Sequence, residues 1–358
     1  GNGNGNEIEN GTILKGTITS DVTLAAGNTY KLSGEYIVEE GATLHIEEGV
    51  KIIAVYDDIA DYILVKQGGK INAVGTPDKP IVMTSEKEEP GAWGGIHICG
   101  RAHTNAEGGK GSSEIGGAVY GGNDDADNSG TLQYIRLEYT GFAFDEEHEA
   151  NGISFYGVGN GTIVDHCQAY KGSDDGFEFF GGSVNVSNLV AVSCSDDSFD
   201  WTEGWNGKGT NLVAYQEAES TLGYDCDCLM ECDNNGSNNA ATPVAHPVLK
   251  NLILVGNGGS KQGIRLRAGT EVEIDNAKVC GKGQPLTVET ALTENALKNG
   301  TSKLTNITLT SELSCKEGIY THADFIAVTS NKVDANLSYS SFEDIKKECS
   351  WMNGSWVK

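Results

Sequence analysis

Six carboxylates occur in two copies of one short motif, and their spacing makes them the strongest candidates for chemistry. Ser-Asp-Asp-Gly-Phe-Glu-Phe occupies residues 173–179, and Ser-Asp-Asp-Ser-Phe-Asp-Trp occupies residues 195–201, 22 positions later. The carboxylates are Asp174, Asp175, Glu178, Asp196, Asp197 and Asp200. Each copy alternates apolar and polar residues, which is the period of a β-strand. If the copies stack on adjacent coils, equivalent carboxylates lie about 5 Å apart.

Three roles are open for these stacked carboxylates. Like charges at that distance repel, so a Ca²⁺ ion shared by their oxygens is one expectation. Two of them could instead act as general acid and base in glycoside hydrolysis. The third role is a bend in which Asp side chains accept hydrogen bonds from backbone amides. If the protein is an enzyme, the candidate catalytic residues are Asp175, Asp197, Asp200, Arg265 and Arg267.

Two arginines alternate in Gly-Ile-Arg-Leu-Arg-Ala, so Arg265 and Arg267 project from the same side of one strand. In a lyase, such a residue would abstract the α-proton of a uronate bound to Ca²⁺. The other interpretation is that both arginines neutralise the acidic motif, and this is the one we favour.

A second candidate cation site is the loop Asn-Asp-Asp-Ala-Asp-Asn-Ser-Gly, which contains Asp124, Asp125 and Asp127. Alternating oxygens in a Gly-bounded loop resemble part of a Ca²⁺ loop, although the Gly and Glu positions of an EF-hand are missing. A solvated acidic loop is the alternative. The charge run at residues 145–149 lacks metal-ligand spacing and indicates a solvated loop.

Aromatic residues near the acidic motif are candidate platforms for sugar rings. Trp201 and Trp205 border a Gly-containing turn, and we expect them to bind carbohydrate together with Tyr156 and Tyr224.

The chain also has nine cysteines. Three of them, Cys226, Cys228 and Cys232, lack the usual zinc spacing, so local disulfides or buried thiols are expected instead.

A second repeated position accompanies the acidic motif. Aligning the segments between its copies brings six residues to one position: His166, Asn188, Asn211, Asn251, Asn276 and Asn306. The steps between them are 22, 23, 40, 25 and 30 residues, which a 22-residue coil with insertions explains. Asn side chains at one bend of each coil would form a hydrogen-bonded ladder.

This period and the short alternating strands predict an all-β fold, a single-stranded right-handed parallel β-helix. We expect a flexible leader over residues 1–12, the β-helix over 13–310 and a divergent C-terminal cap over 311–358. Residues 342–349 are expected to form a short helix that closes the end of the stack. Polar stretches without periodicity predict three excursions, at about 101–130, 141–150 and 231–243.

Several motifs resemble those of a family of secreted β-helix proteins from Bacteroidetes and some marine bacteria. Besides the acidic motif and Gly204-Trp205, they are Gly-Ala-Thr-Leu-His-Ile-Glu-Glu-Gly at 41–49, Gly-Thr-Pro-Asp-Lys-Pro-Ile-Val-Met-Thr at 75–84, Gly-Ala-Trp-Gly-Gly at 91–95 and Tyr-Gly-Gly-Asn-Asp-Asp-Ala-Asp-Asn-Ser-Gly at 120–130. The resemblance covers about residues 10–270. It implies a lipoprotein-like surface protein of uncharacterised function, with a lipid anchor upstream of residue 1. In architecture the chain is more distantly similar to pectate lyases and polygalacturonases.

The charge balance limits the partners. The 51 acidic and 25 basic residues give a net charge of −26, which argues against nucleic acid as a partner. The sequence has no apolar run long enough for a transmembrane helix. We therefore expect an exported protein, extracellular or on the outer-membrane surface, that binds a polysaccharide or other glycan without catalysis, with Ca²⁺ ordering the acidic turns. The alternatives are a polysaccharide lyase or glycoside hydrolase that uses the same face, and a structural surface spacer.

Overall fold

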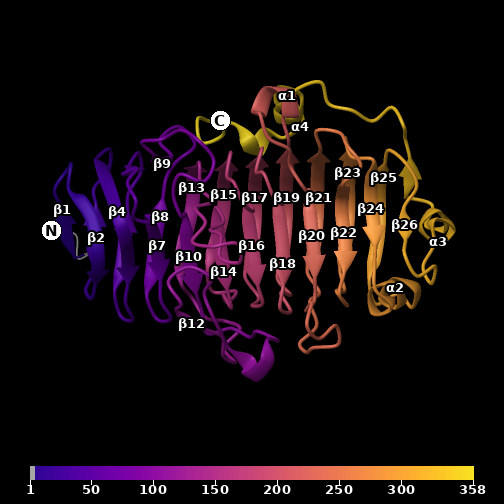
Figure 1. Ribbon diagram of the computed structural model, residues 1–358, viewed down its shortest axis with the longest axis horizontal. Helices are drawn as coiled ribbons and strands as arrows, with labels where there is room; N and C mark the ends of the chain where they lie inside the picture. The colour runs from indigo at the N-terminus through magenta and orange to yellow at the C-terminus, as the bar shows by residue number, and fades with distance from the viewer. Residues whose placement is uncertain (1–4) are drawn as a thin grey trace.

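The computed structural model describes residues 5–358, which form one elongated stack of coils with parallel strands (Figure 1). Residues that repeat along the chain pair in register on neighbouring coils. For example, Phe177 pairs with Phe199, and Phe199 pairs with Met230. The prediction of a right-handed parallel β-helix is confirmed.

Each coil contributes to three parallel sheets. Seven long strands cross a bend from the first sheet into the second: β13 (Gly130–Glu138), β15 (Ile163–Tyr170), β17 (Asn185–Val192), β19 (Lys208–Tyr215), β21 (Val248–Val255), β23 (Glu273–Cys280) and β25 (Lys303–Leu309). Shorter strands extend the first sheet towards the N-terminus: β1 (Asn6–Ile8), β3 (Val22–Leu24), β5 (Thr43–Ile46) and β8 (Lys70–Val74). The second sheet also contains β6 (Lys51–Ala54), β9 (Ile81–Ser85) and β27 (Lys332–Val333).

The third sheet carries the acidic motif. The strands β2 (Ile13–Ile18) and β4 (Thr29–Val38) run from the second sheet into it. Its other strands are β7 (Tyr62–Val65), β10 (Ile96–Cys99), β14 (Ile153–Tyr156), β16 (Phe177–Phe180), β18 (Phe199–Thr202), β20 (Met230–Asp233), β22 (Gln262–Arg267), β24 (Gln284–Val288) and β26 (Ser314–Cys315). Alternate residues of these strands point into one continuous apolar core, as period-two alternation requires.

Two of the three predicted excursions match connections between strands. The longest, around residues 101–130, joins β10 to β13 and contains η1 (Glu107–Gly109) and the antiparallel pair β11 (Gly111–Ser112) and β12 (Val119–Tyr120). The second, 141–150, joins β13 to β14. The third begins later than predicted, because residues 231–233 belong to β20. A connection at 216–229, with α1 (Glu219–Leu222), was not predicted.

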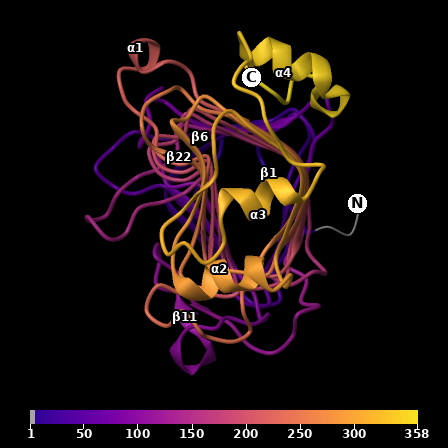
Figure 2. The same cartoon turned by 90° about the vertical axis from the view of Figure 1, so that its right-hand side faces the viewer.

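The chain ends differ from the sequence-based expectation. Asn6–Ile8 pair with β3, so the expected leader over 1–12 is already part of the stack there, while residues 1–4 lie outside the described residues. The helix expected at 342–349 forms as α4 (Phe342–Glu348), followed by η2 (Ser350–Met352), but it packs on the outside of the second sheet. Figure 2 looks along the stack and shows α3 (His322–Ala327) across its end instead, with α2 (Ala291–Lys298) at one edge.

The last residues run back along the stack from α3 towards the N-terminal coils (Figure 1). The Trp356 backbone N–H donates to the carbonyl oxygen of Pro77, and the Lys358 N–H donates to the side chain of Gln168. No helix within residues 5–358 has the length and apolar character to span a membrane.

Candidate functional site

The outer face of the third sheet aligns the acidic motif with later polar residues. In successive strands, Glu178 pairs with Asp200, Asp200 with Glu231, and Glu231 with Arg265. All four alternate with core residues such as Phe177 and therefore point outward. The spacing in sequence thus becomes a column of side chains at strand spacing.

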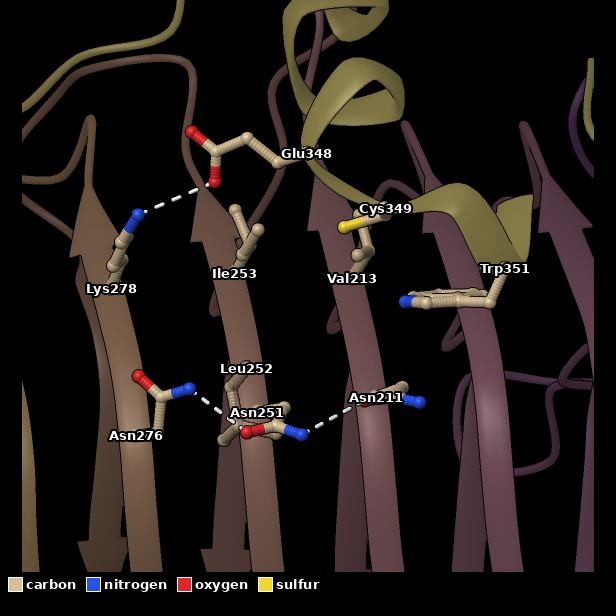
Figure 3. Close-up of a pocket in the computed structure, with 10 residues that line it drawn as sticks. All are labelled: Asn211, Val213, Asn251, Leu252, Ile253, Asn276, Lys278, Glu348, Cys349 and Trp351. Carbon is tan, nitrogen blue, oxygen red and sulfur yellow. Dashed lines mark hydrogen bonds and ion pairs between the residues drawn. The ribbon is translucent and has the colours of Figure 1, made fainter. Parts of the chain in front are cut away.

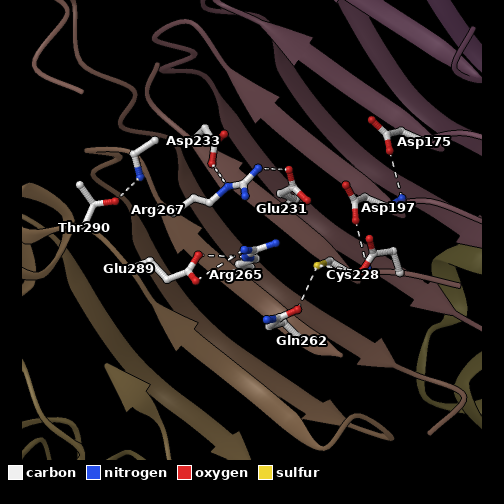
Figure 4. Close-up of polar contacts among 12 residues, drawn as sticks. Asp175, Asp197, Cys228, Glu231, Asp233, Gln262, Arg265, Arg267, Glu289 and Thr290 are labelled. Carbon is white, nitrogen blue, oxygen red and sulfur yellow. Dashed lines mark hydrogen bonds and ion pairs between the residues drawn. The ribbon is translucent and has the colours of Figure 1, made fainter. Parts of the chain in front are cut away.

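A second row of carboxylates lies at the turns that precede these strands. Oδ1 of Asp175 accepts a hydrogen bond from the backbone N–H of Asp197 at 3.0 Å. Oδ1 of Asp197 in turn accepts from the N–H of Cys228 at 3.0 Å (Figure 4). Each carboxylate therefore organises the turn of the next coil, so the bend role includes a contact between coils.

The carboxylates also converge closely enough to hold a metal ion. Ligand atoms lie within 4.8 Å of one another in two sets that share Asp175, one with Asp174 and Asp196 and one with Asp197 and Asp200. We call these five aspartates together with Glu178 the acidic cluster. A set of carboxylate oxygens without nitrogen ligands suits Ca²⁺, so the donor chemistry fits this ion. A third set combines Asp197 and Asp227 with the Cys228 thiol.

Burial makes the ionised cluster unfavourable on its own. Burial, followed by the charges of neighbouring carboxylates, raises the pKa of Asp174 to about 9. The same two causes raise the pKa values of Asp175, Glu178, Asp197 and Asp200 well above their usual range. A bound cation would offset both effects, because it favours the charged forms.

Both arginines of the later strand are paired with carboxylates. The Arg265 Nε donates to Glu289 at 3.0 Å, and the Arg267 Nε donates to Asp233 at 2.7 Å. Arg267 also bonds to Glu231 through its Nη2 (Figure 4). Although burial opposes the charge, these carboxylates raise the pKa of both arginines. Both side chains are therefore fixed cations that compensate the acidic column.

A cavity of about 720 Å³ lies over this part of the sheet. Its walls include Asp233, Arg265, Arg267, Glu289 and Lys316. Because Glu231 bonds to Arg267 and pairs with Asp200, the cavity adjoins the acidic cluster. The volume falls within the range of small-ligand sites.

The expected aromatic platform is not formed. Trp201 and Trp205 are each 1% exposed. The Trp205 ring stacks on that of Phe179 inside the core, with 4.0 Å between the ring centroids. Trp201 points inward because it shares the alternation of Phe199. Tyr156 is covered by the excursions, and Tyr224 is half-buried with its hydroxyl donating to the carbonyl of Ser193. The carbohydrate-platform prediction is therefore wrong for the two tryptophans and Tyr156.

The loop with Asp124, Asp125 and Asp127 holds the chain together instead of gathering its carboxylates. Asp125 accepts from the backbone N–H of His103, and Asp127 accepts from the N–H of Arg101. Asp124 accepts from its own turn, at the N–H of Ala126. Within residues 5–358, none of these three aspartates belongs to a group whose ligand atoms converge. The partial Ca²⁺ loop is therefore not formed.

The Asn ladder exists over four coils on the other side of the molecule. Asn211 donates to Asn188 at 2.9 Å. Figure 3 shows the next two bonds, from Asn251 to Asn211 at 3.1 Å and from Asn276 to Asn251 at 2.8 Å. All four have positive φ values, as the bend between the first and second sheets requires. Three residues of the ladder, Asn211, Asn251 and Asn276, line a second cavity of about 360 Å³ together with Trp351.

The two ends of the predicted ladder have other partners. His166 also has a positive φ, but its ring bonds to Asp165 and stacks on Tyr134. Asn306 donates to Asp275 instead of Asn276.

The cysteines are thiols in the described structure, which covers all nine. Eight are buried and Cys315 is half-buried, so the buried thiols expected as one alternative are present and the local disulfides are not.

Several residues of this face were not predicted from the sequence. Glu231 and Asp233 fell within a predicted excursion, although Met-Glu-Cys-Asp aligns with Phe-Asp-Trp-Thr of β18. Asn151 occupies the position of Asp175 one coil earlier, with its Nδ2 donating to Ser154 at 2.9 Å. Its Oδ1 is buried without a hydrogen-bond partner. Aligning every coil on its inward residues would have shown these positions.

Comparison with known proteins identifies the architecture. A family model described as a pectate-lyase-like β-helix domain matches residues 16–358, which includes the whole third sheet from β4 onward and the C-terminal segment. No curated protein and no solved structure gave a match.

Proposed function

Because the chain belongs to the pectate-lyase-like β-helix domain family, we propose that it binds a polysaccharide on the outer face of the third sheet without cleaving it. In this proposal Ca²⁺ occupies the acidic cluster, held by Asp174, Asp175, Asp196, Asp197 and Asp200. The observation that carries the proposal is the position of this cluster beside the cavity that contains Arg265 and Arg267. The cavity offers hydroxyl-rich ligands both donors and acceptors at its wall.

The geometry favours binding over catalysis. Asp175 and Asp197 are 3% and 1% exposed, and each uses one oxygen on the backbone of the next coil. A glycosidic oxygen in the cavity would therefore not reach them. To act as the catalytic base of a lyase, an arginine would have to lose its proton. The carboxylates around Arg267 oppose that loss, because they stabilise the charged guanidinium.

The proposal also includes the cellular location of the protein. Motifs such as Gly-Ala-Trp-Gly-Gly at 91–95 and the acidic motif resemble those of secreted surface proteins, and this supports export to the cell surface. Protease treatment of intact cells tests it, because a surface protein is digested while an internal one is protected.

The binding test is electrophoresis in gels that contain plant, algal and host polysaccharides, first with calcium and then with EDTA. We expect retardation by at least one polysaccharide with calcium, loss of retardation with EDTA, and no new reducing ends in a parallel assay. New reducing ends would show a lyase or hydrolase. Neither retardation nor reducing ends would indicate a spacer.

A matched pair of variants assigns the effect to the acidic cluster. Asp175→Asn with Asp197→Asn keeps both hydrogen-bond acceptors but removes two charges. The control Asp58→Asn with Glu88→Gln removes two exposed charges elsewhere. We expect the first variant to lose bound calcium. We also expect its Kd for the polysaccharide to rise at least about tenfold, which corresponds to about 1.4 kcal/mol of binding free energy. Unchanged calcium content would contradict the cation site.

A further inference from the structure

The outer face of the third sheet is closed at one end and open at the other. The column that contains Glu178 is fully buried at β7, β10 and β14, where its members are Leu64, His97 and Ser154, and it is exposed again only beyond these strands, at Thr17 of β2. Glu178 itself is 9% exposed. Further along, apart from buried Thr287, the column is half-exposed or exposed, at Asp200, Glu231, Arg265 and Ser314.

Two excursions close the N-terminal end. Ile115, Ala118 and Tyr120 from the 101–130 excursion and Ala150 from the 141–150 excursion pack on the outward side chains of four strands. These side chains are Leu64, Cys99, Tyr156 and Phe180. The excursions therefore form an apolar wall that ends at the strand of Glu178.

Hydrogen bonds hold this wall in place across several coils. The Tyr120 hydroxyl donates to the Glu203 carboxylate at 2.9 Å, and the Thr104 hydroxyl donates to the same carboxylate at 2.7 Å. Asn105 donates to Asn234 at 2.8 Å, which links the excursion to the loop after β20. With such connections the wall is a fixed part of the site.

We infer that the outer face of the third sheet, next to the apolar wall, receives the terminal residue of a polysaccharide chain. The rest of the chain would leave towards β22, β24 and β26. This inference rests on the proposed function. Neighbouring strands lie about 4.8 Å apart, which is close to the length of one sugar residue along an extended chain, so each ring would span about one coil. A chain laid along the column would therefore meet the wall within one or two rings of the acidic cluster. The connections 216–229 and 234–247 lie at the two ends of β20, in the strand direction.

Binding stoichiometry tests the inference with the full chain. The probe is polygalacturonate and a size series of its oligomers in calcium, or the equivalent series from whichever polysaccharide retards the protein. Light scattering or analytical ultracentrifugation gives the number of protein molecules bound per polysaccharide chain at saturation. Recognition of a chain end predicts one protein per chain at every length.

The outcomes separate the inference from the proposal beneath it. A stoichiometry that rises in proportion to chain length would overturn recognition of chain ends while leaving polysaccharide binding intact. Absence of binding to every polysaccharide would overturn both. If cleavage is found instead, terminal recognition requires release of small products with little loss of viscosity, and rapid loss of viscosity would overturn it.

Discussion

Oδ1 of Asp175 accepts a hydrogen bond from the backbone N–H of Asp197, 3.0 Å away and one coil further along the stack. The same carboxylate converges with those of Asp197 and Asp200. One side chain therefore supports the turn of the next coil and belongs to a buried group of carboxylates whose ionisation is unfavourable. The hydrogen bond stabilises the fold, whereas the buried carboxylate destabilises it when ionised. Substitutions of Asp175 can therefore separate the two effects.

Replacing Asp175 by Asn or by Ala distinguishes the hydrogen bond from the charge. Both variants remove the carboxylate, but only Asn keeps an acceptor for the Asp197 N–H. We expect Asp175→Ala to be about 1–3 kcal/mol less stable than Asp175→Asn, because a buried donor loses its partner. Urea unfolding in EDTA measures the difference, with Asp58→Asn as an exposed control. Equal stabilities of the Asn and Ala variants would contradict the structural role.

The pH dependence of stability reports the buried charges. Asp174 has a pKa of about 9 in the folded protein, raised by burial and then by neighbouring carboxylates, against about 3.9 in an unfolded chain. Between these values the folded state binds more protons, so its stability falls as pH rises. For Asp174 the loss is about 1.4 kcal/mol per pH unit within this window.

Urea unfolding in EDTA at pH about 7 and about 8.5 measures this loss. We expect a lower midpoint at the higher pH and a smaller difference in saturating calcium, because the ion stabilises the ionised carboxylates. A midpoint that rises with pH in EDTA would show that the carboxylates ionise freely in the folded state.

The repeats made the coil predictable, because stacked coils place chemically similar residues at one position. Phe177 and Phe199 are 22 residues apart and directly paired, so the period in the sequence is the period of the structure. The Asn residues of the ladder were found for the same reason. Their positive φ values favour Asn over most side chains at the bend.

The errors arose where packing, and not the repeat, decides the outcome. Trp201 shares the alternation of Phe199, which indicates the core, but its place beside a Gly-containing turn suggested a surface position. The C-terminal segment has no repeat, and its place on the second sheet depends on contacts with residues over 200 positions away, such as Arg136 with Ser355. The partners of Arg267 lie 34 and 36 residues away, and both fell within a segment predicted to be an excursion, although they belong to β20.

The Asn ladder allows a third stability prediction. Asn251 has a φ of 62° and takes part in two ladder hydrogen bonds, to Asn211 and from Asn276. We expect Asn251→Gly to lose about 0.5–1.5 kcal/mol for each bond. Asn251→Ala should lose about 1–2 kcal/mol more, because alanine is strained in the left-handed region.

Urea unfolding of both variants tests the ladder, and Asn160→Ala, at an exposed asparagine, serves as the control. If Asn251→Ala matched Asn251→Gly, the bend would not impose the left-handed conformation in solution. If both matched the wild type, the ladder bonds would contribute nothing to stability.

The returning C-terminal segment is expected to be an integral part of the fold. Trp356 is fully buried, and its ring lies 5.9 Å from that of Tyr134 and 5.4 Å from that of His166. We expect Trp356→Ala to lower the free energy of unfolding by about 3–5 kcal/mol, as for other large core aromatics. Trp351→Ala, which truncates a half-buried indole of the same segment, should cost much less. Urea unfolding compares the two, and equal, near-zero losses would mean that the segment detaches before the stack unfolds, because stability would then be local to the segment.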